Sequence, residues 1–349
     1  MSAAVEYCRE VLPDVSRTFA LNIPALPAPL DDIVTVAYLL CRIADTVEDE
    51  SVCAVAERRA RLEELAALTL LGDRWEARAQ TFATRALQGL RPQAPKPEVR
   101  LLGETAVVLR ALSELPDWTW PHIARCVKEM TDGMGELAVD RGDHPLPLGL
   151  PDTETTLRYC YYVAGTVGVM LTGLFAGFSP KVAARQQELA ARAAAFGRAL
   201  QLTNILKDIR DDLLRGDCWL PRTVMAEHGL TAQTLLEPAR RSQSVAMLDD
   251  LVALASRETL PALEYSLALP AEQPGLRLFC LWPLFFAVLT LARLRGNPAV
   301  FGPEPVKISR EQVVEVMVRT RERVGDDAAL RSLFEELGGG LTLGAGATV

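Results

Sequence analysis

Two acidic clusters constrain this sequence more than any other feature. They are Asp45-Thr-Val-Glu48-Asp49 and Asp208-Ile-Arg-Asp211-Asp212. Each lies in a segment whose apolar residues recur at intervals of three and four, the spacing of an amphipathic helix. One such cluster is equally typical of a solvated helix face. Two of them, both within apolar helices, favour a shared chemical task.

The first cluster belongs to a predicted helix from Asp31 to Glu50. Its apolar stripe consists of Ile33, Val36, Ala37, Leu40 and Ala44. Residues three, four and seven apart share a helix face. The polar residues that this spacing places together are Tyr38, Arg42, Asp45 and Asp49.

The second cluster follows the same progression. The apolar positions are Leu200, Thr203, Leu206 and Leu213, and the polar ones are Gln201, Asn204, Asp208 and Asp212. The spacing predicts one helix that carries this polar face, and we expect the two acidic faces to be partners.

Carboxylates on facing helices repel one another unless a cation lies between them. With no His or Cys nearby, oxygen ligands favour a hard cation, and Mg²⁺ is commonly held by a few carboxylates together with substrate phosphates. The sequence therefore predicts Mg²⁺ at Asp45, Asp49, Asp208 and Asp212 and a diphosphate substrate. Glu48 and Asp211 lie beside these faces and are weaker candidates.

Composition excludes several other classes of function. Hydrophobic residues make up 49% of the 349 residues, charged residues 23%, and the net charge is −8. This balance indicates a soluble globular protein and disfavours nucleic acid as a partner. The seven cysteines form no C-x-x-C pair, and the three histidines, His122, His144 and His228, are scattered, so no zinc site is expected.

Nothing in the sequence predicts a transmembrane segment. The amino terminus lacks the basic and apolar regions of a signal peptide, so we expect a cytoplasmic protein. The longest apolar runs, Val163–Phe178 and Leu278–Ala292, are shorter than the roughly 20 residues that a span needs. We interpret both runs as buried helices.

Helical periodicity dominates the whole chain, which predicts an all-α fold. One domain over residues 1–337 and a frayed tail over 338–349 are expected, because no change of composition marks a linker. The predicted loops are Asn22–Asp31, Arg91–Pro97, Gly142–Pro151, Leu220–Pro221 and Pro270–Gly275.

Several motifs, taken together and in order, resemble the squalene/phytoene synthase family. The resemblance covers about Cys8 to Arg319. It rests on Val15–Phe19, Ala37–Asp49, Tyr159–Gly168 and Gln201–Asp212. Phe279-Cys-Leu-Trp-Pro283 and Val306-Lys-Ile308 are similar to the squalene synthase branch of that family.

This resemblance implies an isoprenoid synthase fold with a central cavity. It also implies head-to-head condensation of two farnesyl diphosphates to presqualene diphosphate, which then rearranges and takes hydride from NADPH to give squalene. The alternatives are release of presqualene diphosphate, dehydrosqualene formed without reductant, phytoene from a longer diphosphate, or a non-catalytic interaction protein. The form implied is soluble and of bacterial type, with a possible peripheral membrane contact for product release.

The resemblance also assigns roles to residues. Tyr159 matches a tyrosine implicated in proton transfer, Tyr38 would stabilise a cation, and Arg42 would contact phosphate unless it only pairs with Asp45. Ser16, Arg17 and Thr18 match a diphosphate-contacting loop, although a Ser before an apolar run also starts helices. Other substrate contacts implied are Gln201, Asn204 and Phe279, the last of which could instead be a packed core residue.

NADPH contacts rest on the resemblance alone. They are Asn204, Lys207 and Lys307, the last of which could also be a solvated surface lysine. Gly165 and Gly168 would allow close approach of helices or of a prenyl chain. Two positions depart from the family pattern: Asp217 stands where a basic residue is expected, and Ser309 follows Ile308 in place of one.

Overall fold

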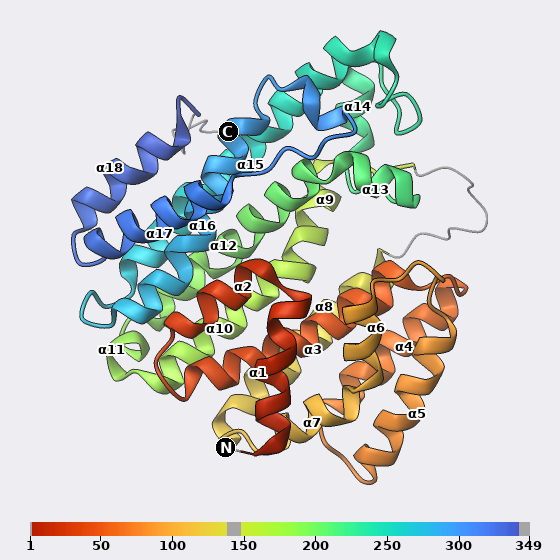
Figure 1. The fold of residues 1–349 in the computed structure, drawn as a ribbon, viewed down its shortest axis with the longest axis vertical. Coiled ribbons are helices and arrows are strands. Elements are labelled where there is room, and N and C mark those ends of the chain that lie inside the picture. Colours follow the sequence, from red (N-terminus) through yellow and green to blue (C-terminus); the bar gives the residue numbers. More distant parts are fainter. Residues whose placement is uncertain (1, 138–147, 342–349) are drawn as a thin grey trace. The chain divides into compact units, whose positions relative to one another are not determined.

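The computed structural model describes residues 2–137 and 148–341, and this part of the chain is helical (Figure 1). Within these ranges there is no β-strand, and extended pairing is limited to the isolated bridges Ser51 to Leu90 and Leu150 to Pro221. The all-α prediction is confirmed. His144, most of the predicted loop Gly142–Pro151 and residues 342–349 of the predicted tail lie outside the described residues.

The chain divides into two compact units, each described by itself. The first unit contains Met1–Asp140 and Val169–Gln186, and the second contains Arg141–Gly168 and Gln187–Val349. The single domain expected over residues 1–337 stays a prediction.

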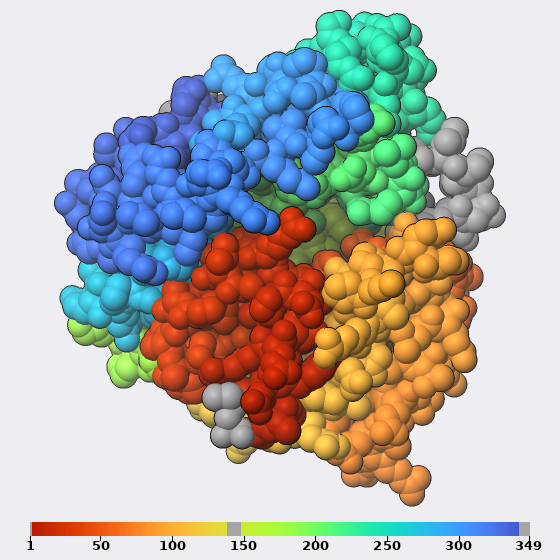
Figure 2. All heavy atoms as spheres, viewed as in Figure 1, coloured from red at the N-terminus to blue at the C-terminus, as the bar shows by residue number. Residues whose placement is uncertain are grey.

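In the first unit, helix α3 (Leu30–Glu50) lies at the centre, in contact with α1, α4, α6, α7 and α8. It confirms the helix predicted from Asp31 to Glu50, and its buried apolar residues meet those of the surrounding helices. Helices α5, α6 and α7 form one contiguous surface of this unit (Figure 2). The surrounding elements are α1 (Ala3–Val15), α2 (Arg17–Asn22), η1 (Ile23–Ala25), α4 (Val55–Leu68), α5 (Trp75–Gln88), α6 (Lys96–Gly103), α7 (Thr105–Ser113), η2 (Asp117–Thr119), α8 (Trp120–Glu136), most of α10 (Thr166–Phe178) and α11 (Pro180–Ala183).

In the second unit, the apolar helix α16 (Pro274–Leu294) contacts α15, α17 and α18. Arg277 on α16 is 4% exposed and joins the ends of these helices, because its guanidinium donates to the carbonyls of Leu269, Leu267 and Val324 and to the Asp327 carboxylate. The other elements are α9 (Thr153–Cys160), the π-helical turn η3 (Tyr161–Gly165), α12 (Gln186–Lys207), α13 (Ile209–Arg215), α14 (Arg222–Glu227), η4 (Pro238–Arg240), α15 (Arg241–Ala268), η5 (Pro298–Phe301), α17 (Arg310–Arg323) and α18 (Asp327–Gly338).

Both long apolar runs are helical, and the expected absence of a transmembrane segment stays a prediction. Each run continues into a longer helix, one over Thr153–Phe178 with 26 residues and one over Pro274–Leu294 with 21. By length and composition alone, both are long and apolar enough for a span. The second has 83% of its apolar window buried inside the protein, as in a core helix, and the first has 50%.

Candidate functional site

The first acidic face forms as the sequence predicted. From Ile33 to Glu50, every residue of α3 is buried except Tyr38, Arg42, Asp45 and Asp49. These four are the residues assigned to one helix face by their spacing. Glu48, a weaker candidate, is only 5% exposed and lies off this open face.

Arg42 lies between two carboxylates. Its Nη2 donates to Glu98 Oε1 at 2.8 Å, while its Nη1 is 3.7 Å from Asp45 Oδ2. The predicted pair with Asp45 therefore exists, but the pair with Glu98 is closer. Sequence reasoning missed Glu98, whose only signal was its position as an acidic residue in the first turn of a helix, where a carboxylate is favoured.

The environment of Asp45 suits a cation ligand. Burial by the surrounding protein raises the pKa of Asp45 to about 7; Arg42 opposes this rise, and the nearby Asp49 carboxylate adds to it. A carboxylate that lacks solvation and faces a like charge is stabilised by a nearby cation. The donor set of this face, two Asp carboxylates without His or Cys, consists of the oxygen ligands that Mg²⁺ prefers.

The Val15–Phe19 motif lies against Tyr38. The Tyr38 hydroxyl donates to the Val15 carbonyl at 3.4 Å, and its ring is 5.0 Å from that of Phe19, centroid to centroid. Burial raises the pKa of Tyr38 to about 12, so this phenol keeps its proton at neutral pH. Ser16 caps helix α2 by accepting from the Phe19 amide at 3.0 Å, which confirms the helix-start interpretation for this residue. The neighbouring Arg17 and Thr18 are exposed.

The second acidic motif is interrupted, so the prediction of one continuous helix was wrong. Helix α12 ends at Lys207 and α13 begins at Ile209, because Asp208 departs from helical geometry with φ −105° and ψ 12°. The turn is nevertheless preserved: the Asp208 amide donates to the Asn204 carbonyl at 3.0 Å, and the Asp212 amide donates to the Asp208 carbonyl at 2.9 Å. Asp208 and Asp212 thus stay one turn apart.

Asp208 and Asp212 of this second motif each pair with a different cation. Lys207 Nζ lies 2.5 Å from Asp208 Oδ2, and Arg215 Nη2 is paired with Asp212 Oδ1. Asp212 is 7% exposed. Asp211 is exposed, as its alternative role of a solvated residue requires. Asn204 is exposed and Gln201 half-buried on the same segment.

Tyr159 is held by a ring stack that the sequence did not reveal. Its ring lies parallel to that of Trp219, with centroids 4.1 Å apart and an interplanar angle of 7°. Trp219 follows α13 by four residues, and its carbonyl accepts from the Thr156 hydroxyl at 3.4 Å. The stack therefore joins the predicted proton-transfer tyrosine to the segment that follows the second acidic motif.

The remaining predicted residues of this unit lie in different environments. Phe279 is 1% exposed within α16, as a packed core residue would be. Lys307 is exposed in the segment between η5 and α17, and its carbonyl accepts from Arg293 Nη1 at 2.9 Å. Arg210 Nη1 donates to the Phe301 carbonyl at 3.1 Å, which ties α13 to η5 at the start of that segment.

The two predicted glycines lie where a Cβ would not fit. A Cβ on Gly168 would lie 2.1 Å from the Ala193 carbonyl oxygen of α12, and a Cβ on Gly165 would lie 2.8 Å from the Tyr161 ring. Such contacts are too short for any side chain. Gly168 therefore fits the interpretation of close helix approach, whereas the close contact at Gly165 is with a side chain of its own helical turn.

Metal ligation by a larger cluster is not observed. In residues 2–137 and 148–341, no group of three or more His, Cys, Asp or Glu side chains converges in a way that could hold a metal ion. His228 Nε2 instead lies 2.7 Å from Asp250 Oδ2. Each acidic motif supplies a pair of carboxylates, which fits Mg²⁺ bound through one or two carboxylates and substrate phosphates.

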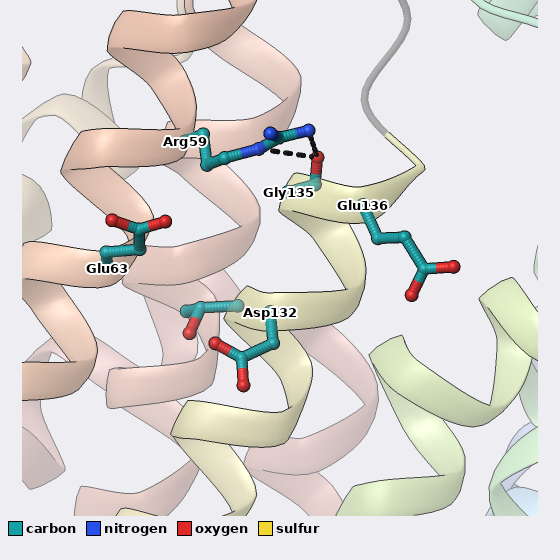
Figure 3. A pocket seen from close by; sticks show the side chains of 6 residues that line it. Arg59, Glu63, Asp132, Gly135 and Glu136 are labelled. Atoms are coloured by element: carbon teal, nitrogen blue, oxygen red, sulfur yellow. Dashed lines mark hydrogen bonds between the residues drawn. The ribbon is translucent and has the colours of Figure 1, made fainter.

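A shallow pocket of about 290 Å³ opens between α4 and α8 in the first unit. There the Arg59 guanidinium donates through Nε and Nη2 to the Gly135 carbonyl, at 3.1 and 2.8 Å (Figure 3). Its lining residues are Arg59, Glu63, Thr131, Asp132, Gly135 and Glu136. No residue of either acidic motif lines it, and Asp132 pairs with Lys128 at 2.6 Å.

Comparison with known proteins shows which family the chain resembles. The family model described as squalene/phytoene synthase matches residues 12–312. A squalene synthase (BSS) of Botryococcus braunii is 30% identical over 89% of this chain, which spans 63% of that relative's length, less than two thirds. A 15-cis-phytoene synthase of Enterobacter agglomerans is 28% identical over 77% of each chain.

Solved structures share the fold. The structure of TcSQS with the ligand BPH1237 superposes with a TM-score of 0.78, at 23% identity, over 96% of this chain and 90% of that one. The match to the family model extends over most of the chain and includes both acidic motifs. The chain belongs to the squalene/phytoene synthase family.

Proposed function

We propose that this protein is a prenyltransferase that condenses two farnesyl diphosphates into presqualene diphosphate and, with NADPH, converts this intermediate to squalene. The observation that carries the proposal is the open face of α3, where Tyr38, Arg42, Asp45 and Asp49 are the residues left unburied between Ile33 and Glu50. A tyrosine, an arginine and two carboxylates on one face suit a metal-bound diphosphate beside a developing cation. Family membership and the squalene synthase relative support the same assignment.

In the first half-reaction, the C1–O bond of one farnesyl diphosphate breaks and its electron pair leaves with the diphosphate. The C2–C3 double bond of the second molecule captures the allylic cation, and loss of a proton closes the cyclopropane. Bound Mg²⁺ would neutralise the charge that develops on the leaving group. Asp45 and Asp49 on α3 would bind Mg²⁺ as one pair and Asp208 and Asp212 as another, with Arg42 as a planar donor to diphosphate oxygens.

The tyrosines would act through their hydroxyls and rings. Tyr38 keeps its proton, because burial raises its pKa to about 12, so its ring face rather than a phenolate would stabilise the cation. Tyr159 Oη would relay the proton lost in ring closure to the departing diphosphate, with its orientation set by the Trp219 stack. Exclusion of water would protect the cation from capture.

NADPH would supply hydride to the rearranged cation in the second half-reaction. Of the predicted contacts, Lys207 already pairs with Asp208, whereas Lys307 is exposed and suits a cofactor phosphate as a point charge. Lys307→Ala should therefore weaken NADPH use and spare presqualene diphosphate formation. Product analysis at several NADPH concentrations measures this difference.

Chromatography of products extracted after incubation with farnesyl diphosphate and Mg²⁺ tests the whole proposal. We expect squalene with NADPH and presqualene diphosphate without it. The phytoene synthase relative favours a second candidate, a reductant-independent condensation. A profile dominated by dehydrosqualene or phytoene, and indifferent to NADPH, would establish that candidate instead.

A further inference from the structure

Glu98 is a buried carboxylate that directly contacts the proposed diphosphate site. It lies in the first turn of α6, which packs against α3, and only 9% of the residue is exposed. Free helix amides at this end favour a negative charge. Since so little of Glu98 is accessible, any effect on a ligand must pass through the side chain that it contacts.

That side chain is Arg42. Glu98 Oε1 accepts from Arg42 Nη2 at 2.8 Å, whereas Arg42 Nη1 is 3.7 Å from Asp45 Oδ2. The side chains of Arg42 and Asp45 are 29% and 32% exposed, against 12% for Glu98. Two carboxylates thus share one guanidinium, and the less accessible one holds it more closely.

The pair also leaves hydrogen-bonding capacity unused. Arg42 Nε and Glu98 Oε2 are both buried and have no hydrogen-bond partner in the described structure. Buried donors are nearly always paired in folded proteins. Nε itself is buried, so a ligand from outside the protein would accept from the terminal N–H groups of Arg42, whose side chain is 29% exposed, and a diphosphate oxygen has the required chemistry.

We propose that Glu98 is a positioning residue that acts through Arg42. By holding Nη2, it keeps the guanidinium from closing onto Asp45, so that the Asp45 oxygens stay available to Mg²⁺ and the remaining N–H groups stay available to diphosphate. Without the Glu98 charge, Arg42 would form a tight pair with Asp45, its neighbour one helical turn away. The inference rests on the proposed function of this face.

Binding of inorganic diphosphate with Mg²⁺ tests the inference without turnover. The measurement is the shift of the urea unfolding midpoint that Mg²⁺ and diphosphate together produce, titrated to give an apparent dissociation constant. Glu98→Gln should raise that constant about tenfold, as expected for loss of a charge-assisted contact. The matched control is Glu76→Gln, which removes the same charge from an exposed pair with Arg110 at 2.9 Å and should change nothing.

A double-mutant cycle separates positioning from general destabilisation. In an Arg42→Gln background, Glu98→Gln should have no further effect on diphosphate affinity. An equal loss in both backgrounds would overturn the inference, as would unchanged affinity of the single variant. If Glu98→Gln does not fold, Glu98→Asp keeps the charge but shortens its reach by one methylene. It should bind more weakly than the wild type, and wild-type affinity would overturn the inference.

The wild-type titration distinguishes failure of the proposed function from failure of the proposed role of Glu98. No stabilisation of the wild type by Mg²⁺ and diphosphate would contradict the proposed function and this inference with it. A normal wild-type response combined with an unaffected Glu98→Gln protein would contradict the role of Glu98 alone.

Discussion

The two acidic motifs have the same spacing, but their aspartates pair differently with the neighbouring cationic side chains. On α3, Arg42 is 3.7 Å from Asp45, because Glu98 binds the same guanidinium at 2.8 Å. At the junction of α12 and α13, Lys207 lies 2.5 Å from Asp208, and Arg215 pairs with Asp212. In the first motif a third carboxylate thus shares the cation with Asp45, whereas in the second motif Asp208 and Asp212 each pair with a different cation.

This difference teaches that an acidic pattern alone does not define the local charge. Among the groups just named, with Asp49 and Asp211 added, the first motif has one cation against three carboxylates, and the second has two cations against three carboxylates. The first is therefore the stronger attractor for a divalent cation. The second presents lysine and arginine that diphosphate oxygens could recruit from their aspartates.

The largest expected effect comes from removing one charge in either motif. Asp45→Asn and Asp208→Asn should each lower the rate of presqualene diphosphate formation by about 10³-fold, since each removes an anionic ligand where the leaving-group charge develops. Single-turnover assays on folded protein measure it. Near wild-type turnover in a folded Asp45→Asn protein would remove the metal assignment of α3.

Arg277 is a buried cation with four hydrogen-bond acceptors and provides a comparison with Arg42. Arg277 donates to three backbone carbonyls and to Asp327, and is 4% exposed. Arg277→Met should lower the free energy of unfolding by about 3 kcal/mol, because those carbonyls lose their donors. Urea unfolding checks the loss. Arg42→Gln should instead lower turnover with little change in the free energy of unfolding. A large loss of stability with little loss of turnover would contradict the comparison.

Removal of the ring stack on Tyr159, which lies within the second unit, should have a smaller effect on turnover. Trp219→Leu should lower turnover about tenfold, because a tilted phenol misplaces its hydroxyl. Trp219→Phe keeps a ring to stack on and should recover most of the rate. Comparing kcat and KM of the two variants measures the effect. Equal loss in Phe and Leu variants would show that the aromatic stack does not matter.

The smallest effect is on metal-free stability, and its sign should differ between motifs. Asp45→Asn should raise the free energy of unfolding at pH 8 by about 1 kcal/mol, since it removes a desolvated charge beside Asp49. Asp208→Asn should lower it by up to about 1 kcal/mol, because Lys207 loses its partner. Unfolding in the presence of a chelator checks both. Changes of the same sign would contradict the electrostatic difference proposed here.

Local periodicity predicted what depends on one helix. The extent of α3 and its open face followed from spacing, because burial on a helix repeats with its turn. The break at Asp208 did not, since the apolar period continues through it and only the backbone angles of one residue change. Glu98 and Trp219 were missed because they meet Arg42 and Tyr159 through tertiary packing, which the spacing within one segment does not encode.

The family resemblance located motifs that periodicity could not interpret, but it did not describe their surroundings. Phe279 matched a substrate-contact position and lies buried in α16, while Lys307 matched a cofactor contact and is exposed. Ser16 matched a diphosphate-contacting loop and caps α2. Each role depends on neighbours that belong to other elements.

Diphosphate release from farnesyl diphosphate, measured as a function of Mg²⁺ concentration, tests the central claim most directly. The claim is that the carboxylate face of α3 binds Mg²⁺ for the departure of diphosphate. The wild-type protein should release diphosphate with a saturable Mg²⁺ requirement, lose release in a chelator, and lose it again on Asp45→Asn substitution. Release that is unaffected by chelation, or absent at every Mg²⁺ concentration, would contradict it.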